Sequence, residues 1–191
     1  MDAPLFPQRK ANRLSAFDYS ACGAYFVTVC TAPRKNHFWL PGYENSWGKE
    51  DGGDAVGADM IRPPVLSDAG KTAEAAILAI PDHYRGIDVA RYCVMPDHLH
   101  LLLLFLSDED GRMISAPTLS RVIGSMKRWV SRQLGYAVWQ KSFYDRVIRS
   151  EKGYLAACRY IDENPARWRE DHGDDGAAFD DDLFMDSLPG I

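Results

Sequence analysis

The sequence of 191 residues contains no long hydrophobic segment, and this absence excludes a membrane-spanning helix. The longest apolar run, residues 99–106, is interrupted by His100 and is far shorter than the roughly 18 apolar residues that a span requires. The N-terminus also lacks the basic and then apolar pattern that is typical of a secretory signal peptide. We therefore expect a cytoplasmic protein that has no membrane segment.

Cysteine is scarce, and its spacing argues against a disulfide framework. The chain has 4 cysteines and no Cys-x-x-Cys pair. Most of them fall in or beside expected strands or helices, where buried reduced thiols are more common than disulfides. The composition, with 46% apolar and 12% aromatic residues, is instead typical of a globular domain that buries a core of its own.

Net positive charge is lacking as well, because the formal net charge is -5. The carboxylates are concentrated, however, in two Gly-containing segments, residues 44–59 and 169–191. The remaining body of the chain is therefore basic and compatible with a polyanionic partner. We expect a single domain over residues 1–168, with an acidic Gly-rich insertion at about 41–64. Residues 169–191 are expected to form an acidic flexible tail.

The hydrophobic pattern predicts four strands and three helices. In chain order they are strand 24–31, helix 68–80 with Ser67 as its N-cap, strands 87–94 and 98–105, a helix opening at Pro117, strand 144–149 and helix 151–163. The two central strands are joined by a short turn, so they should pair as an antiparallel hairpin. This order favours an α+β class, a ferredoxin-like sandwich in which the first two helices cover one face of an antiparallel sheet. The C-terminal helix is additional and would cover the other face.

The segment Asp97-His98-Leu99-His100 gives the first indication of chemistry. Side chains alternate along a strand, so His98 and His100 project from the same face, about 7 Å apart. Two imidazoles placed in this way can bind one metal ion if a third ligand comes from elsewhere. Alone, the pattern favours two ordinary histidines on the solvent face of a half-buried strand. Asp97 is expected to belong to the turn and to point away from this face.

The expected C-terminal helix offers the missing groups. Helical spacing places Tyr154, Cys158 and Ile161 on its core-facing stripe. Tyr160 and Asn164 lie one turn apart on the flank of that stripe. With Asn164 as third ligand, a hard divalent ion such as Mg²⁺ or Mn²⁺ would keep open positions to polarise a phosphate. Tyr160 beside that ion could attack phosphorus as the nucleophile. Without the histidines, these two residues would indicate only an amphipathic surface and a helix cap.

Two blocks of the sequence together resemble the REP-associated tyrosine transposases, which belong to the HUH endonucleases. The run Met95-Pro-Asp-His-Leu-His100 is similar to the His-hydrophobic-His motif of that superfamily. The run from Val138 to Glu151, followed by Tyr160-Ile-Asp-Glu-Asn-Pro-Ala-Arg167, is similar to the C-terminal half of these transposases. The resemblance extends over residues 19–168 apart from the 41–64 insertion.

The resemblance implies cleavage and rejoining of single-stranded DNA at repetitive extragenic palindromes, which fold as hairpins. It makes His98 and His100 metal ligands and Tyr160 the nucleophile, whose attack leaves a 5′-phosphotyrosine and a free 3′-hydroxyl. Asn164 occupies the position of the third, polar ligand. The protein would then be an HUH transposase, a DNA nuclease and ligase that depends on Mg²⁺ or Mn²⁺ and acts as a monomer or homodimer.

Basic residues are the candidates for contacts with DNA phosphates. They are Arg121, Lys127, Arg128 and Arg132 on the second helix, and Lys141, Arg146 and Arg149 nearer the expected nucleophile. For the second-helix group, a charged outer face is the commoner explanation. Trp129, Trp139 and Phe143 are candidates for stacking on unpaired bases, and core packing is the commoner role for at least two of them. Two other functions stay open: a hairpin-DNA-binding protein without significant catalysis, and a metal-dependent hydrolase of a small phosphoester.

Overall fold

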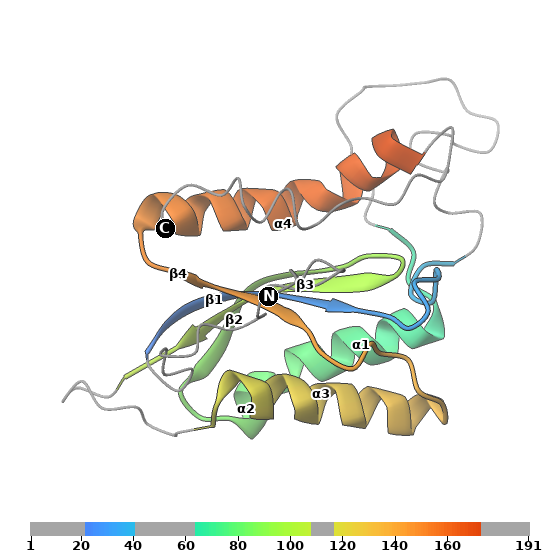
Figure 1. Cartoon of the computed structure of the whole chain (residues 1–191), viewed down its shortest axis with the longest axis horizontal. Helices are drawn as coiled ribbons and strands as arrows, with labels where there is room; N and C mark the ends of the chain where they lie inside the picture. The colour runs from blue at the N-terminus through green and yellow to red at the C-terminus, as the bar shows by residue number, and fades with distance from the viewer. Residues whose placement is uncertain (1–21, 41–63, 108–116, 173–191) are drawn as a thin grey trace, which may run out of the picture.

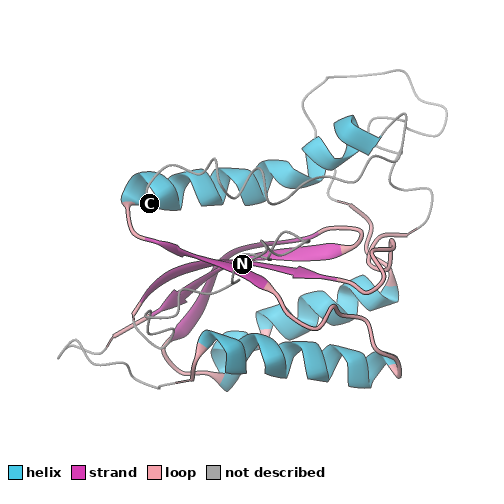
Figure 2. Ribbon diagram, viewed as in Figure 1, coloured by secondary structure: helices cyan, strands magenta, loops and turns pink. Residues whose placement is uncertain are grey.

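The computed structural model describes residues 22–40, 64–107 and 117–172, with the last four residues described by their backbone alone. The elements are β1 (Gly23–Cys30), α1 (Asp68–Leu78), α2 (Ile80–His83), β2 (Ile87–Val94), β3 (His98–Phe105), α3 (Leu119–Leu134), β4 (Tyr144–Ile148) and α4 (Glu151–His172). All but one residue of the expected insertion and most of the acidic tail lie outside the described residues. Figure 2 shows the elements as two helical layers on either side of one sheet.

The four strands form a single antiparallel sheet in the order β2-β3-β1-β4. Helices α1, α2 and α3 cover one face, and α4 lies along the other (Figure 1). The predicted α+β class, with an antiparallel sheet and an additional C-terminal helix, is therefore confirmed. No helix in the described part of the chain is long and apolar enough to cross a membrane.

β3 is a central strand with helices over both of its faces. Leu101 lies beside Tyr92 in the sheet, and the Tyr92 hydroxyl donates to Glu74 of α1 over 3.0 Å, so this is the face of α1 and α3. Because side chains alternate, His98 and His100 point to the opposite face, towards α4. Each fully buried leucine of β3 stabilises the fold by roughly 1.5–3 kcal/mol relative to exposure. Burial of Leu99, Leu101 and Leu103 against α1 and α3 therefore keeps His98 and His100 on the face of α4.

Local capping signals position the first two long helices. The Ser67 hydroxyl oxygen accepts from the Gly70 N–H over 3.1 Å, so the predicted N-cap is confirmed. Helix α1 ends at Leu78, two residues before the predicted end at residue 80. Pro81 stands in the first turn of the short helix α2 that follows, where a missing N–H is tolerated. Helix α3 begins after Thr118 and ends at Gly135, whose left-handed φ of 77° suits glycine.

Helix α4 is longer than the sequence predicts. The expected end at Glu163 is wrong, because the helix continues through Pro165 to His172. The expected start of the tail after Trp168 therefore falls inside the helix. Proline in a helix removes one hydrogen bond and crowds the preceding turn, and Figure 1 shows the end of α4 tilted from the rest. Burial of one face of α4 against the sheet outweighs this local cost.

Candidate functional site

The β2–β3 hairpin places two histidines in the middle of the sheet. His100 stands between Thr28 of β1 and Cys93 of β2 in the register, and His98 stands opposite Cys30. Both imidazoles are only 1% exposed. The interpretation as two histidines on a solvent face is therefore wrong. Helix α4, which is the helix expected on this face of the sheet, covers them.

Backbone hydrogen bonds hold the turn that precedes the histidines. The Met95 N–H donates to the His98 carbonyl over 2.9 Å. The Asp97 carbonyl accepts from both the N–H and the hydroxyl of Thr31, at 2.8 and 2.9 Å. The turn is thus tied to the end of β1, which leaves Asp97 and His98 little freedom to move relative to the sheet.

The two imidazole rings converge on one point. Their Nε2 atoms are 3.0 Å apart. On the far side of each ring, Nδ1 meets an oxygen: the Asp97 carboxylate at 2.6 Å from His98, and the Thr28 hydroxyl at 2.9 Å from His100. A carboxylate accepts only, so Nδ1 of His98 carries the hydrogen, and a neutral ring then presents a lone pair at Nε2. If the Thr28 hydroxyl likewise accepts from Nδ1–H, His100 presents a second lone pair at the same point.

Electrostatics favour the ionised carboxylate and the neutral ring. Burial lowers the pKa of His100 well below its ordinary value, and the nearby charge of Arg34 lowers it further. Burial by itself would raise the pKa of Asp97. The hydrogen bond from His98 and the charge of Arg34 outweigh burial, so the net pKa of Asp97 is lowered. His100 is therefore neutral and Asp97 ionised near neutral pH.

This donor set fits a divalent metal ion. Two ligands at about 2.1 Å from one ion and at right angles to each other are about 3.0 Å apart, which is the separation of the two Nε2 atoms. The oxygen partners on Nδ1 are those that orient metal-binding histidines. No cluster of three His, Cys, Asp or Glu residues suited to a metal occurs within the described ranges. A third protein ligand would thus have to be of another type.

Helix α4 brings Tyr160 and Asn164 to the histidine face. The Tyr160 hydroxyl is 3.5 Å from Nε2 of His100, and the two rings meet edge to face with centroids 5.2 Å apart. Tyr160 is 3% exposed and Asn164 6%, so both lie on the buried face of the helix. The predicted flank position is therefore wrong. Tyr154 and Cys158, expected at the centre of the core stripe, are only half-buried.

Several residues beside the histidines were missed or misplaced in the sequence interpretation. Asp97 points towards His98, contrary to the prediction, because the turn folds its side chain back over the strand. Thr28 could have been found as a polar residue inside the apolar run of β1. The Trp168 ring lies 5.6 Å from the ring of His98, and this contact arises only because α4 continues past Pro165.

The basic residues of α3 are not brought to the histidines. Helix α3, which carries Arg121, Arg128 and Arg132, packs on the face of the sheet opposite to α4, the helix of Tyr160 (Figure 1). Lys127 has a structural role. Its ammonium donates to the carbonyls of residues 140, 141 and 142 at 2.7, 3.4 and 3.0 Å, which fastens the loop before β4.

The second group of basic residues is nearer the histidines. Arg146 of β4 stands opposite Phe26 in the register, and the Phe26 ring contacts both His100 and Tyr160. Arg149 is exposed between β4 and α4, and Lys141 is exposed in the loop before β4. Of the seven basic candidates, Arg146 is therefore the one whose strand position is on the histidine face.

Comparisons with known proteins agree with the sequence resemblance. No protein-family model matches the chain. It is 26% identical over 182 residues to an uncharacterised protein of Haemophilus influenzae, a match that covers 85% of this chain and 91% of that protein. It is 28% identical over 94 residues to a second protein of the same organism, named "Putative REP-associated tyrosine transposase", with 45% of this chain and 53% of that protein covered.

The fold also has a solved counterpart. A structure described as a REP-associated tyrosine transposase bound to a REP hairpin superposes with a TM-score of 0.51 and 17% sequence identity. The match covers 85% of this chain and 74% of that chain. The resemblance to the REP-associated tyrosine transposases is therefore confirmed, by sequence over part of the chain and by fold over most of it.

Proposed function

We propose that this chain, which resembles the REP-associated tyrosine transposases, is a single-stranded DNA endonuclease and strand-transferase that acts on palindromic hairpins. One observation carries the proposal: the Tyr160 hydroxyl lies 3.5 Å from Nε2 of the buried His100, which is itself 3.0 Å from Nε2 of His98. A protein that only binds hairpins needs neither the tyrosine nor the paired imidazoles at that point. The REP hairpin bound by the similar solved transposase supports a palindromic hairpin as the substrate.

His98 and His100 would hold a divalent metal ion, Mg²⁺ or Mn²⁺, with Asn164 as the third protein ligand. When bound, the ion would polarise the oxygens of the scissile phosphate. Asp97 and Thr28 orient the two imidazoles through their Nδ1 atoms, which keeps the Nε2 lone pairs aimed at one point. Arg146, Arg149 and Lys141 would contact the backbone of the bound strand.

Tyr160 carries out the covalent step. Its phenolic oxygen forms a bond to phosphorus, and the bond from phosphorus to the 3′-oxygen breaks. The phenolic proton ends on the departing oxygen, so the products are a 5′-phosphotyrosine and a free 3′-hydroxyl. Attack by a 3′-hydroxyl on the phosphotyrosine is the reverse reaction and rejoins the DNA.

The strand order read from β4 to β2, β4-β1-β3-β2, supports the ferredoxin-like assignment of the fold. We place the catalytic domain in residues 1–168 together with the remainder of α4. The protein would act in the cytoplasm as a monomer or homodimer. The alternative of a small-phosphoester hydrolase predicts no covalent DNA adduct, and the alternative of a hairpin binder predicts no cleavage.

The experiment that tests the proposal is the Tyr160→Phe substitution, which removes one oxygen and keeps the ring. We expect loss of cleavage and of the covalent adduct on a denaturing gel, with hairpin binding changed by no more than a few-fold. Tyr144→Phe is the matched control, because Tyr144 lies opposite Thr28 on the same face of the sheet. A full-strength adduct from Tyr160→Phe would refute the assignment of the nucleophile.

A further inference from the structure

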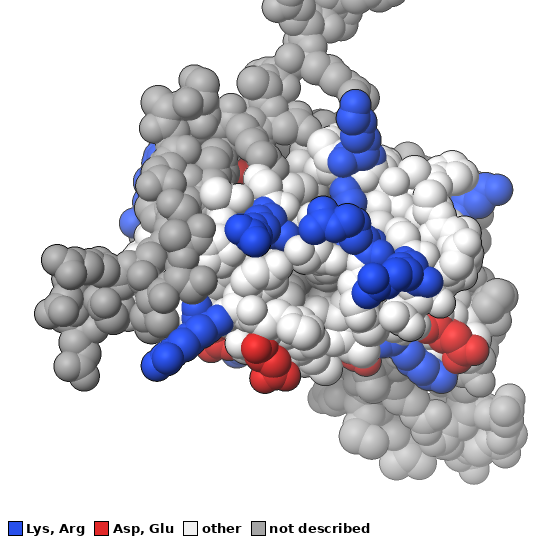
Figure 3. All heavy atoms as spheres, turned by 90° about the horizontal axis from the view of Figure 1, so that it is seen from below, with Lys and Arg blue, Asp and Glu red and all other residues white. Residues whose placement is uncertain are grey.

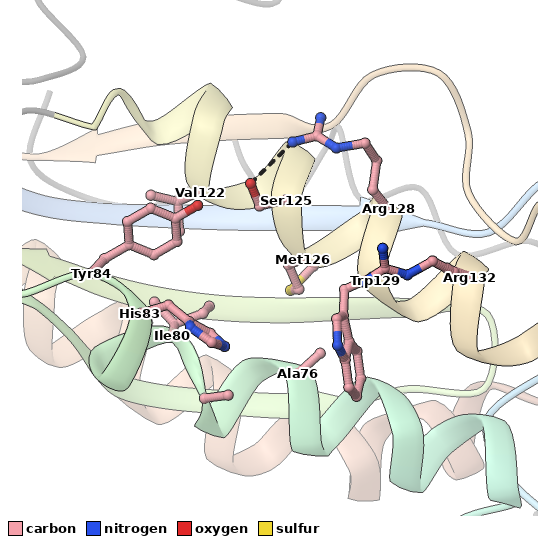
Figure 4. Close-up of a pocket in the computed structure, with 11 residues that line it drawn as sticks. Ala76, Ile80, His83, Tyr84, Val122, Ser125, Met126, Arg128, Trp129 and Arg132 are labelled. Carbon is pink, nitrogen blue, oxygen red and sulfur yellow. Dashed lines mark hydrogen bonds between the residues drawn. The ribbon is translucent and has the colours of Figure 1, made fainter.

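A groove lies on the side of the molecule away from the histidines. It runs between α1 and α2 on one side and α3 on the other, and its volume is about 760 Å³ (Figure 4). Small-molecule sites occupy roughly 300–1,000 Å³, so the groove is of that size. Its floor is apolar and consists of Ala76, Val122 and Met126, all nearly inaccessible to solvent.

Aromatic side chains form the walls of this groove. The Trp129 indole extends from α3 towards α1 and lies beside Ala76, and the Tyr84 ring lies at the other end (Figure 4). Trp129 is 36% exposed, whereas Trp39 is 1% exposed in the core. A large aromatic ring beside an apolar floor offers a stacking surface for a planar ligand.

Positive charge accompanies the aromatic wall. Arg128 and Arg132 line the groove, and the Arg128 guanidinium donates to the Ser125 hydroxyl over 3.1 Å. Helix α3 has no acidic residue over its 16 residues. Figure 3 shows this face of the molecule, with basic side chains gathered around a shallow hollow and acidic ones towards the rim. Asp82 of α2 is next in the sequence to His83, which lines the groove, but the Asp82 carboxylate itself does not line it.

We propose that the groove binds an unpaired base of single-stranded DNA, stacked on Trp129, with the adjoining phosphates on Arg128 and Arg132. A nucleotide unites a π-face with an anionic backbone, which is the combination that an aromatic wall and two guanidinium groups complement. An apolar helix of a partner protein is a poorer occupant of the groove. It would bury the two arginine side chains without an anionic group beside them, and burial of unpaired charge is costly. The ligand class rests on the proposed function, but the groove takes no part in the cleavage step.

The path from the groove to Tyr160 runs around one end of the sheet. Helix α3 ends at Gly135, and the segment that follows is bonded to the end of β1. Gln140 N–H donates to the Cys30 carbonyl at 2.9 Å, and Ala32 N–H donates to the Val138 carbonyl at 2.7 Å. Cys30 stands opposite His98 in the register. A DNA strand that leaves the groove near the C-terminal end of α3 therefore reaches the histidines by passing around this end of the sheet.

Binding of a short fluorescent oligothymidylate tests the aromatic part of the proposal. Trp129→Leu keeps an apolar side chain without a π-face and should weaken binding by about 5- to 150-fold, the range for loss of one stacked base. Trp129→Phe keeps a ring and should retain most of the affinity. Leu78→Ala is the control, because Leu78 is an exposed apolar residue of α1 that does not line the groove. An abasic strand of equal length should bind all these proteins alike.

Salt titration tests the arginines. Arg132→Gln should reduce the log-log salt dependence by about 0.7, the value for one phosphate contact with a single strand. Arg121→Gln is the matched control on the same helix, because Arg121 is exposed and does not line the groove. Equal effects of these two substitutions would overturn the proposal in favour of a general charged surface.

Two further outcomes would also overturn it. One is equal oligothymidylate affinity of the Trp129→Leu and Trp129→Phe variants. The other is a concentration-dependent dimer in sedimentation that Trp129→Leu abolishes, which would assign the groove to a second copy of the chain. Adduct formation is measured on the same preparations. If no adduct forms but oligothymidylate binding still depends on Trp129, only the proposed function is refuted. If an adduct forms but binding does not depend on Trp129, only the proposed role of the groove is refuted.

Discussion

The hydrogen bond between Asp97 and His98 makes a quantitative prediction about metal affinity. Asp97→Asn keeps an oxygen that can accept from Nδ1 of His98 but removes the negative charge. The 2.6 Å separation is shorter than the usual 2.7–2.9 Å of a charge-assisted N–H···O bond, and both side chains are nearly buried. The carboxylate therefore increases the electron density that the ring offers through Nε2, and the substitution should weaken metal binding.

The expected loss follows from the position of Asp97 behind a metal ligand. Substitution of such outer partners lowers metal affinity by about 10- to 100-fold. Because asparagine still orients the ring, we expect the lower end, about tenfold or ~1.4 kcal/mol. Isothermal titration of the purified protein with Mn²⁺ measures this directly and does not depend on cleavage. Thermal melting of the same samples checks that the variant is folded.

Asp68→Asn is the matched control for this experiment. Asp68 is exposed on α1, and its carboxylate forms a surface ion pair with Lys71 at 3.5 Å. The same loss of one negative charge there should leave Mn²⁺ affinity unchanged. If Asp97→Asn binds Mn²⁺ as tightly as the natural sequence, the carboxylate does not support a ligand, and the reasoning on the imidazole pair fails.

Four other measurements follow from the structure. Thr28→Val removes the oxygen partner of the second imidazole and should weaken Mn²⁺ binding several-fold in the same titration. EDTA should abolish hairpin cleavage, and added Mg²⁺ or Mn²⁺ should restore it; full activity in EDTA would exclude the metal. Lys127→Met deletes an ammonium group that donates to three carbonyls and should lower the melting temperature by about 3–12 °C. An unchanged melting temperature would show that Lys127 has no structural role. Gly70→Ala should lower the free energy of unfolding, because the new methyl group would collide with the Phe38 carbonyl. Gly124→Ala should leave the free energy of unfolding unchanged or raise it slightly, because its methyl group meets only the tip of a flexible arginine. Unfolding in denaturant measures both.

The sequence predicts the elements well where a strong local signal exists. The run of four leucines after His100 and the apolar strand before the turn define the hairpin to the residue, and Ser67 defines the start of α1. It predicts the end of α4 badly. Pro165 signals a helix end in isolation, yet the helix packs against the sheet with one face buried, and tertiary packing overrides the signal.

Predictions about the candidate site succeed for the strand and fail at its edges. Strand periodicity alone places His98 and His100 on one face, and the structure brings Tyr160 to that face. The orientation of Asp97 could not be predicted, because alternation applies only inside the strand and a turn residue can fold back over it. Asn164 lies on the same buried face of α4, but its role as a ligand stays a prediction.

The face on which each basic group lies depends on topology rather than on helix periodicity. In a β-α-β-β-α-β chain, each helix connects two parallel strands that flank a third, and the right-handed crossover rule places both helices on the same face. The arginines of α3 are therefore separated by the sheet from His98 and His100 on the face covered by α4. A helical wheel shows that these arginines share a stripe, but it cannot show which layer the stripe belongs to. DNA that contacts both faces must pass around one end of the sheet. Arg132→Gln should therefore reduce binding, whereas Tyr160→Phe should remove cleavage.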